Sequence, residues 1–183
     1  MVDVDKRIKK VLYSQKDIEQ KIVELANWVN EEFKNSNDLI VVCLLKGAMP
    51  FMAQLIKNIS VDHSIDFMIT SSYAGSHASS GSVKIIMDLA NDIENKDVLI
   101  VEDIIDSGIT LEKIKGILLT RKPKKLKILT LLDKPYNRKV NLNADKYGFL
   151  VPDEFLVGFG LDYKEKMRNL PYIGVFDEKF LEK

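Results

Sequence analysis

The chain has 183 residues, of which 46% are hydrophobic and 30% are charged, and its 27 basic and 27 acidic side chains give a formal net charge of zero. These values are typical of a globular domain with a sizeable core, and they exclude a global basic bias toward nucleic acid. The single cysteine, Cys43, excludes an internal disulfide, and no apolar stretch approaches the ~18 residues of a membrane-spanning helix. Because the N-terminus is charged and lacks an apolar signal region, we expect a cytoplasmic protein without a membrane partner.

The first predicted helix follows Ser14, whose spacing to Asp17 is typical of an N-terminal capping box. Apolar residues then recur at helical spacing, which predicts an amphipathic helix that packs on a core. These residues are Ile18, Ile22, Leu25, Ala26, Val29 and Phe33.

A buried strand is predicted over residues 38–45, which are almost entirely aliphatic, and it ends at Lys46-Gly47. A helix over about residues 48–58 follows, with Pro50 in its first turn. Open α/β sheets bind ligands at the carboxyl ends of their strands, so Lys46-Gly47 is a candidate binding loop, with a solvated surface lysine as the alternative. Apolar residues near this helix form a candidate subunit interface; they are Met49, Phe51 and Met52.

Residues 64–72 and 83–89 predict two further strands, and the segment between them is rich in glycine and serine. Long loops in compact domains are often lids over a site, and a flexible hairpin connection is the alternative. His77 lies in this loop, and we assign it no role because a lone loop histidine is more often solvated than a ligand.

The most informative stretch joins a strand, an acidic turn and a helix. Residues 98–101 predict a strand buried on both faces, and the adjacent carboxylates Glu102 and Asp103 follow them. Asp106 and Ser107-Gly108 then lead into a helix that we expect to end at about residue 119. Small residues at a helix N-terminus favour a phosphate, and the three carboxylates favour sugar hydroxyls, a metal ion or a developing cation. A phosphorylated sugar with Mg²⁺ meets these conditions, whereas a strand that merely ends in helix-capping residues is the alternative.

A basic run at residues 121–125 ends this helix, and we interpret it as a solvated connection rather than a nucleic-acid patch. Residues 126–132 predict a fourth buried strand, after which Lys134 and Arg138 are either ligand-binding cations or ordinary surface cations. The last third predicts only short strands without a helix between them, which favours a small accessory subdomain, the hood, over the carboxyl edge of the sheet. These strands are expected at residues 147–151, 155–161 and 172–176.

Together these elements predict an α/β fold, with a doubly wound, mostly parallel sheet flanked by helices and a small hood subdomain from the C-terminal and N-terminal ends. We expect one domain over residues 1–183, with its core at about residues 14–140 and its hood at about residues 141–183.

The segment from Val98 to Thr110, VLIVEDIIDSGIT, resembles the phosphoribosyl-pyrophosphate binding motif of the type I phosphoribosyltransferases, in the form of their hypoxanthine-guanine members. The run from Val151 to Tyr163 resembles the base-binding hood of that family, and the likeness covers essentially residues 39–176. It implies purine salvage, in which phosphoribosyl pyrophosphate and hypoxanthine or guanine give IMP or GMP plus pyrophosphate, with Mg²⁺ as cofactor. Xanthine as the base, or hypoxanthine alone, stays open, and a nucleic-acid-binding regulator of the same fold is the alternative class.

The resemblance assigns roles to individual residues of this chain. The phosphoribosyl and phosphate site comprises Glu102, Asp103, Asp106, Ser107, Gly108, Ile109 and Thr110. The pyrophosphate site comprises Lys46, Gly47, Arg138 and Arg168. The base site comprises Lys134, Phe155, Leu156 and Asp162. The metal ligands are Glu102, Asp103 and Asp162, and the lid tip is Ser72 and Tyr73.

Within these sets, the resemblance makes Asp106 the catalytic acid/base, or an electrostatic stabiliser, beside N7 of the purine. Phe155 stacks on the base, Lys134 reads its exocyclic oxygen, and the peptide before Lys46 is often cis in the family. Ile109 departs from relatives that carry lysine, with little expected consequence because the phosphate contacts there are mostly from the backbone. The family's members are commonly dimers or tetramers, so we expect a homodimer or homotetramer that binds no nucleic acid.

Overall fold

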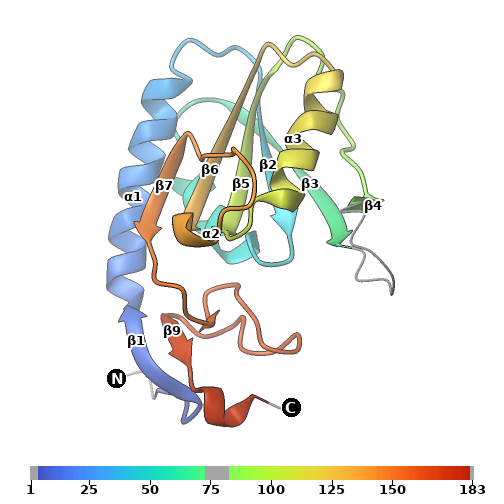
Figure 1. Cartoon of the computed structure of the whole chain (residues 1–183). Helices are drawn as coiled ribbons and strands as arrows, with labels where there is room; N and C mark the ends of the chain where they lie inside the picture. The colour runs from blue at the N-terminus through green and yellow to red at the C-terminus, as the bar shows by residue number, and fades with distance from the viewer. Residues whose placement is uncertain (1–3, 73–82, 182–183) are drawn as a thin grey trace.

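The computed structural model describes residues 4–72 and 83–181, and its main feature is a six-stranded sheet with helices on both faces (Figure 1). The strand order is β4-β3-β2-β5-β6-β7, and every neighbouring pair is parallel except β3 with β4. The strands are β2 (Leu39–Leu45), β3 (His63–Ser72), β4 (Val83–Met87), β5 (Asp97–Ile105), β6 (Lys125–Asp133) and β7 (Lys146–Leu150). The predicted doubly wound α/β fold is confirmed. Within the described ranges, no helix is long and apolar enough to cross a membrane.

Helices α1 (Gln15–Glu32) and α2 (Met49–Leu55) pack on one face of this sheet, and α3 (Ile109–Thr120) packs on the other. Alternate residues of β2 face the two cores, as the two-residue period of a strand requires. Those in the core with α1 and α2 are Leu39, Val41 and Cys43, and those in the core with α3 are Ile40, Val42 and Leu44. Burial on both sides explains the uninterrupted apolar run in the sequence.

The helix starts and lengths follow local chemistry. Ser14 Oγ accepts the N–H of Asp17, and the Asp17 carboxylate accepts the N–H of Ser14, which forms the predicted capping box of α1. The second helix is shorter than predicted, because a 3₁₀ turn, η1 (Ile56–Asn58), follows α2. Phe51 and Met52 are buried in the core, so of the three residues suggested as an interface only Met49, at 53% exposed, remains on the surface.

The hood is a three-stranded antiparallel sheet in the order β1-β9-β8, which lies below the large sheet in Figure 1. Its strands are β1 (Ile8–Tyr13), β8 (Leu156–Val157) and β9 (Ile173–Phe176). The sequence did not predict β1, because Lys9 and Lys10 interrupt its apolar pattern and its partner lies far along the chain. Pairing of β1 with β9 joins the two ends of the chain in one subdomain, which agrees with the predicted hood from the C-terminal and N-terminal ends.

The structure corrects the predicted boundary of the hood. Residues 147–151 were assigned to it, but β7 pairs in parallel with β6 and forms an edge of the large sheet. In the sequence, a short strand that no helix follows looks the same as a strand of the hood. Only its pairing with β6 shows that it belongs to the large sheet. The C-terminal part of the hood therefore begins after Leu150.

The strand predicted over residues 155–161 is also shorter, since β8 ends at Val157. Gly158, Phe159 and Gly160 have φ angles of 97°, 47° and 101°, which a strand cannot accommodate. The chain therefore turns here, and the turn carries Gly160 to the large sheet.

Candidate active site

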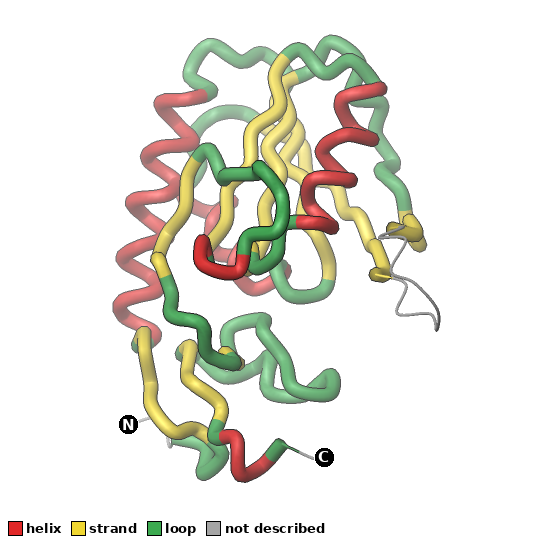
Figure 2. The backbone as a smooth tube through the Cα atoms, viewed as in Figure 1, coloured by secondary structure: helices red, strands yellow, loops and turns green. Residues whose placement is uncertain are grey.

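The candidate site lies at the carboxyl ends of β2, β5 and β6, where the large sheet faces the hood (Figure 2). This edge is the usual ligand-binding position of an open parallel sheet. The hood touches it directly, because a Cβ added to Gly160 would lie 2.0 Å from the carbonyl oxygen of Gly47. The two subdomains therefore meet backbone to backbone, without room for a side chain.

The turn between β5 and α3 encloses a cavity of about 170 Å³. Its lining residues are Glu102, Ile104, Ile105, Asp106, Ser107, Gly108, Thr110 and Leu111. Gly108 is the N-cap residue of α3, and its φ of 78° is a left-handed conformation that glycine adopts without steric cost. Because the first N–H groups of a helix lack intrahelical partners, this turn offers backbone donors and two hydroxyls to an anion.

Glu102 borders this cavity, and Asp103 is the next residue of the chain. They lie inside β5 rather than after it, because pairing with β6 continues through Glu102 with Thr130 and as far as Ile105. Burial, and then the neighbouring Asp103 carboxylate, raise the pKa of Glu102 well above its ordinary value. A cation beside the pair would remove this repulsion, so the electrostatics favour one.

The carboxylate pair suits a divalent metal that shares its ligands with a substrate. Among the residues that the structure describes, no three Asp, Glu, His or Cys side chains form a metal cluster. Mg²⁺ usually takes one or two protein carboxylates and completes its shell with waters and substrate phosphates, so Glu102 and Asp103 fit it. Asp103 also packs on the β2 loop, where a Cβ added to Gly47 would lie 1.6 Å from Asp103 Oδ2.

The side chain of Arg138 packs against the turn between β5 and α3 and contacts its backbone. Its Nη1 donates to the carbonyl oxygen of Asp106 at 2.7 Å, its Nη2 donates to the carboxylate of Asp133, and its side chain is 11% exposed. Gly108 packs on it closely, since an added Cβ would lie 3.0 Å from Arg138 Cδ. This arginine therefore fixes the backbone of the turn, and its expected contact with pyrophosphate stays a prediction.

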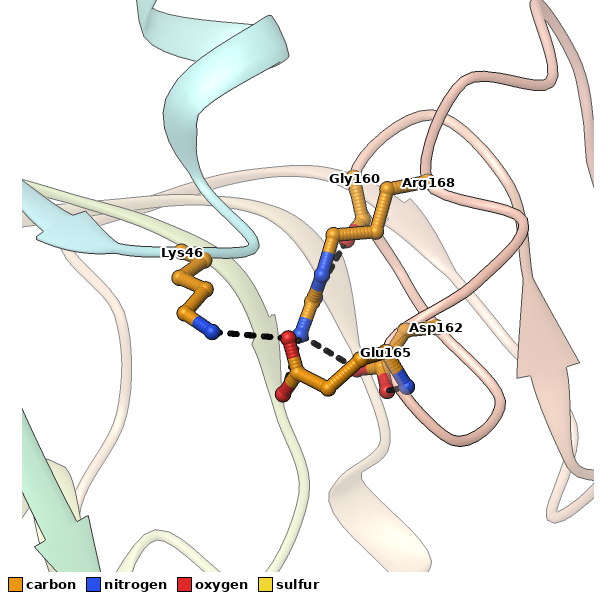
Figure 3. A network of polar contacts seen from close by, with 5 residues as sticks. All are labelled: Lys46, Gly160, Asp162, Glu165 and Arg168. Atoms are coloured by element: carbon orange, nitrogen blue, oxygen red, sulfur yellow. Dashed lines mark hydrogen bonds and ion pairs between the residues drawn. The ribbon is translucent and has the colours of Figure 1, made fainter.

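The two other expected pyrophosphate cations lie in one polar network that joins the β2 loop to the hood (Figure 3). Lys46, which follows a cis Leu45–Lys46 peptide bond, donates to Glu165 Oε2 at 2.8 Å. Arg168 donates through Nη1 to the carbonyl oxygen of Gly160 at 2.7 Å, and its Nη2 lies 2.8 Å from Asp162 Oδ1. Asp162, expected at the base and at a metal, is here engaged by Arg168 and by the N–H of Glu165.

The expected base-binding residues lie at the junction of β6 with the hood. The Lys134 side chain is 10% exposed, and its Nζ donates to the carbonyl oxygen of Glu154 at 2.7 Å. This bond ties the ammonium to the residue that directly precedes Phe155. Phe155 is 44% exposed, and its ring makes T-shaped contacts with Tyr163 and Phe176, with ring centroids 6.1 and 5.8 Å apart. An exposed aromatic ring that its neighbours hold in place is suited to contact a planar ligand.

Leu156 is buried and lies in β8, where it pairs with Val175 of β9, so only its backbone edge is placed to meet a ligand. Ser72 is the last residue of β3. Tyr73 and the rest of the expected lid lie outside the described residues.

A family model of the phosphoribosyl transferase domain matches residues 10–164 of this chain. The chain belongs to the phosphoribosyltransferase family. It is 54% identical over 166 residues to a hypoxanthine phosphoribosyltransferase of Buchnera aphidicola, covering 90% of this chain and 94% of the relative. It is 49% identical over 180 residues to a hypoxanthine-guanine phosphoribosyltransferase of Streptococcus thermophilus, covering 98% and 99% of the two chains.

Solved structures of phosphoribosyltransferases share the fold over the whole chain. A hypoxanthine phosphoribosyltransferase of Staphylococcus aureus superposes with a TM-score of 0.93 at 46% identity, covering 97% of this chain and 96% of that one. A Trypanosoma cruzi enzyme in complex with the product IMP superposes with a TM-score of 0.92 at 32% identity, covering 98% and 100%. The family resemblance that the sequence suggested is therefore confirmed.

Sequence reasoning missed three residues of this phosphoribosyltransferase site: Asp133, Gly160 and Glu165. Asp133 was detectable, because it stands at a strand end directly before Lys134. Glu165 had no such signal, since its partner Lys46 lies 119 positions earlier in the chain. Gly160 matters only through its contact with another loop, which no local pattern reveals.

Proposed function

We propose that this chain transfers the 5-phosphoribosyl group of phosphoribosyl pyrophosphate to N9 of hypoxanthine or guanine, giving IMP or GMP and pyrophosphate. The observation that carries the proposal is the cavity at the start of α3, which Glu102, Asp106 and Thr110 line. This cavity suits a phosphorylated sugar, and the exposed ring of Phe155 in the hood suits a planar base. Relatives that match nearly the whole chain carry this activity in their names, which supports the same conclusion.

Departure of pyrophosphate leaves positive charge on the ribose ring, so fixed anions close to the ring lower the barrier. In this proposal Glu102 and Asp103 bind ribose hydroxyls, while Ser107, Thr110 and the start of α3 bind the 5′-phosphate. Asp106 is exposed and lines the same cavity, where its carboxylate would hold or accept the proton at N7 of the purine.

Base recognition in this proposal rests on Lys134 and the hood. One N–H of the ammonium is committed to the Glu154 carbonyl, which leaves the others to donate to the 6-oxo group of a purine. Phe155 stacks on the ring, and the backbone of Leu156 meets its edge. An adenine carries an amino group at this position, which a lysine donor disfavours.

Mg²⁺, when bound, supplies charge neutralisation for the pyrophosphate leaving group, and Glu102 with Asp103 would hold it together with substrate oxygens. We therefore expect turnover with hypoxanthine or guanine to be abolished by a chelator and restored by excess Mg²⁺. Absorbance changes with hypoxanthine, guanine, xanthine and adenine in turn measure this and rank the bases. Folded protein that converts none of the four, or that is insensitive to the chelator, would contradict the proposal.

Arg138 gives a second test, because its hydrogen bond to the Asp106 carbonyl holds the backbone of the turn between β5 and α3. We expect Arg138→Lys to raise the Kd for IMP by about ten- to a hundredfold, since lysine cannot bridge a carbonyl and a carboxylate as the guanidinium does. Calorimetric titration of IMP measures this. The control is Arg121→Lys, which alters an ion pair with Asp88 at the far end of α3 and should leave the Kd unchanged. Equal Kd values for both variants would show that the turn does not depend on Arg138.

We also propose a cytoplasmic homodimer or homotetramer. Surface apolar side chains support the assembly, with Met49, Ile65 and Ile86 at 53%, 43% and 60% exposed. Light scattering coupled to gel filtration measures the mass, and a monomer at enzyme-assay concentrations would contradict the proposal.

A further inference from the structure

Glu165 lies between the two cations that the proposed function assigns to pyrophosphate (Figure 3). Its Oε2 accepts from Lys46 Nζ at 2.8 Å, and its Oε1 accepts from Arg168 Nη2 at 3.3 Å. The first cation belongs to the β2 loop and the second to the hood, so one carboxylate bridges the two subdomains. The pair with Lys46 is open to solvent, with the Lys46 and Glu165 side chains 63% and 64% exposed, whereas the Arg168 side chain is 24% exposed.

Glu165 lies in a tight turn whose backbone has unfavourable, left-handed φ angles. Tyr163 and Lys166 exchange two backbone hydrogen bonds of 3.1 and 3.0 Å, which closes a tight hairpin. Its two central residues, Lys164 and Glu165, have φ angles of 51° and 64°, values that such turns normally reserve for glycine or asparagine. A long acidic side chain at this position breaks the local rule, and such exceptions gather at functional sites.

The bridging group has the chemistry of the ligand. The Glu165 side chain is 64% exposed and contacts two cations, so it is an ionised carboxylate at neutral pH, as glutamate ordinarily is. Its two oxygens meet the same ammonium and guanidinium donors that oxygens of pyrophosphate would meet. A carboxylate and a pyrophosphate compete for these donors, because both are anions that accept from the same N–H groups.

We propose that Glu165 is an internal counter-anion of the pyrophosphate site, which the pyrophosphate group displaces from Lys46 and Arg168 when it binds. This inference rests on the proposed function. Displacement leaves Arg168 in place, since its bonds to Gly160 and Asp162 remain. Competition by Glu165 weakens binding of the pyrophosphate group and helps the product to leave.

The test compares pyrophosphate binding by the native protein, Glu165→Gln and Glu165→Asp. Glutamine keeps the size and the backbone of the turn but removes the charge, so we expect the Kd for pyrophosphate with Mg²⁺ to fall roughly three- to tenfold. Aspartate keeps the charge but is too short to bridge both cations, so we expect the Kd of Glu165→Asp for pyrophosphate to lie between those of the native protein and of Glu165→Gln. The control is Glu24→Gln, which removes the same charge from an exposed pair with Lys21 on α1 and should leave the Kd unchanged.

Kinetics separate this role from a structural one. For Glu165→Gln we expect the KM for phosphoribosyl pyrophosphate to fall by a similar factor, while the KM for hypoxanthine stays the same. An unchanged or weaker affinity of Glu165→Gln for pyrophosphate overturns the inference. A Lys46→Ala variant tells this failure from failure of the site itself: if it binds pyrophosphate as well as the native protein, the pyrophosphate assignment falls too.

Discussion

Replacing Asp106 by asparagine is expected to lower kcat by about 10²–10⁴-fold, the usual contribution of a general acid or base. Binding should change little, because Asp106 is exposed at the cavity and the phosphate donors are backbone groups and hydroxyls of the same turn. The carbonyl that Arg138 binds is retained in the variant, so the turn keeps its shape. Steady-state kinetics give kcat, and calorimetry with IMP gives the Kd.

The control for this variant is Asp62→Asn, which removes an equal charge from an exposed position just before β3, at the opposite edge of the sheet. It should match the native protein in kcat and Kd. If Asp106→Asn lost affinity and turnover by the same factor, Asp106 would be a binding residue and its acid/base role would be wrong.

Gly160→Ala is expected to impair the site from a distance. Its Cβ would lie 2.0 Å from the carbonyl oxygen of Gly47, and the φ of 101° at this position strains any residue with a side chain. The hood must therefore move away from the β2 loop, which separates Arg168 from Lys46. We expect the KM for phosphoribosyl pyrophosphate to rise at least about tenfold and the free energy of unfolding to fall by about 1–3 kcal/mol.

Gly116→Ala provides the matched control, because Gly116 lies in α3 and an added Cβ would meet nothing within 4 Å. We expect this variant to gain up to about 1 kcal/mol in the free energy of unfolding, from better helix propensity, with unchanged kinetics. Urea unfolding and steady-state assays of the two variants measure both effects. A native KM for Gly160→Ala would mean that contact between the hood and the β2 loop is not needed for binding.

The sequence predicted well wherever function or burial leaves a local pattern. Strands buried on both faces are continuous apolar runs, so β2 and β6 were predicted to within one residue at each end. The strand at β5 was recognised but predicted too short, because its last residues, from Glu102 to Ile105, include two carboxylates. The start of α1 followed from the spacing of Ser14 and Asp17. The turn at Asp106 to Thr110 was recognisable because small residues, hydroxyls and carboxylates stand together there, a combination that would suit a phosphorylated sugar.

Features that depend on tertiary contacts were not predictable in this way. Neither β1 nor the place of β7 is encoded locally, since a short strand of mixed polarity acquires its identity from its partner. The turn at residues 158–160 replaced a predicted strand because left-handed φ angles leave only a weak trace in sequence. The contacts of Arg138 with the carboxylate of Asp133 and the carbonyl of Asp106 were also not predicted, because they depend on how the loop after β6 packs on the turn.

These differences share a physical cause. Several of the residues that bind substrate in this account, such as Lys46, Asp106 and Lys134, follow directly on the ends of strands, where sequence patterns are strong. The residues that position them, among them Asp133 and Gly160, act across the junction between sheet and hood. Such contacts depend on which loops the fold brings together. A single sequence therefore reveals the candidate binding residues but not the residues that hold them in position.

A crystal structure of this chain with IMP, pyrophosphate and Mg²⁺ would test the central claim most directly, because it locates both ends of the ligand at once. The account predicts the 5′-phosphate on the turn from Ser107 to Thr110, the base on Phe155 with its 6-oxo group near Lys134, and pyrophosphate between Lys46 and Arg168, with Glu165 turned away. A nucleotide bound elsewhere, or a phosphate outside the cavity at the start of α3, would contradict it.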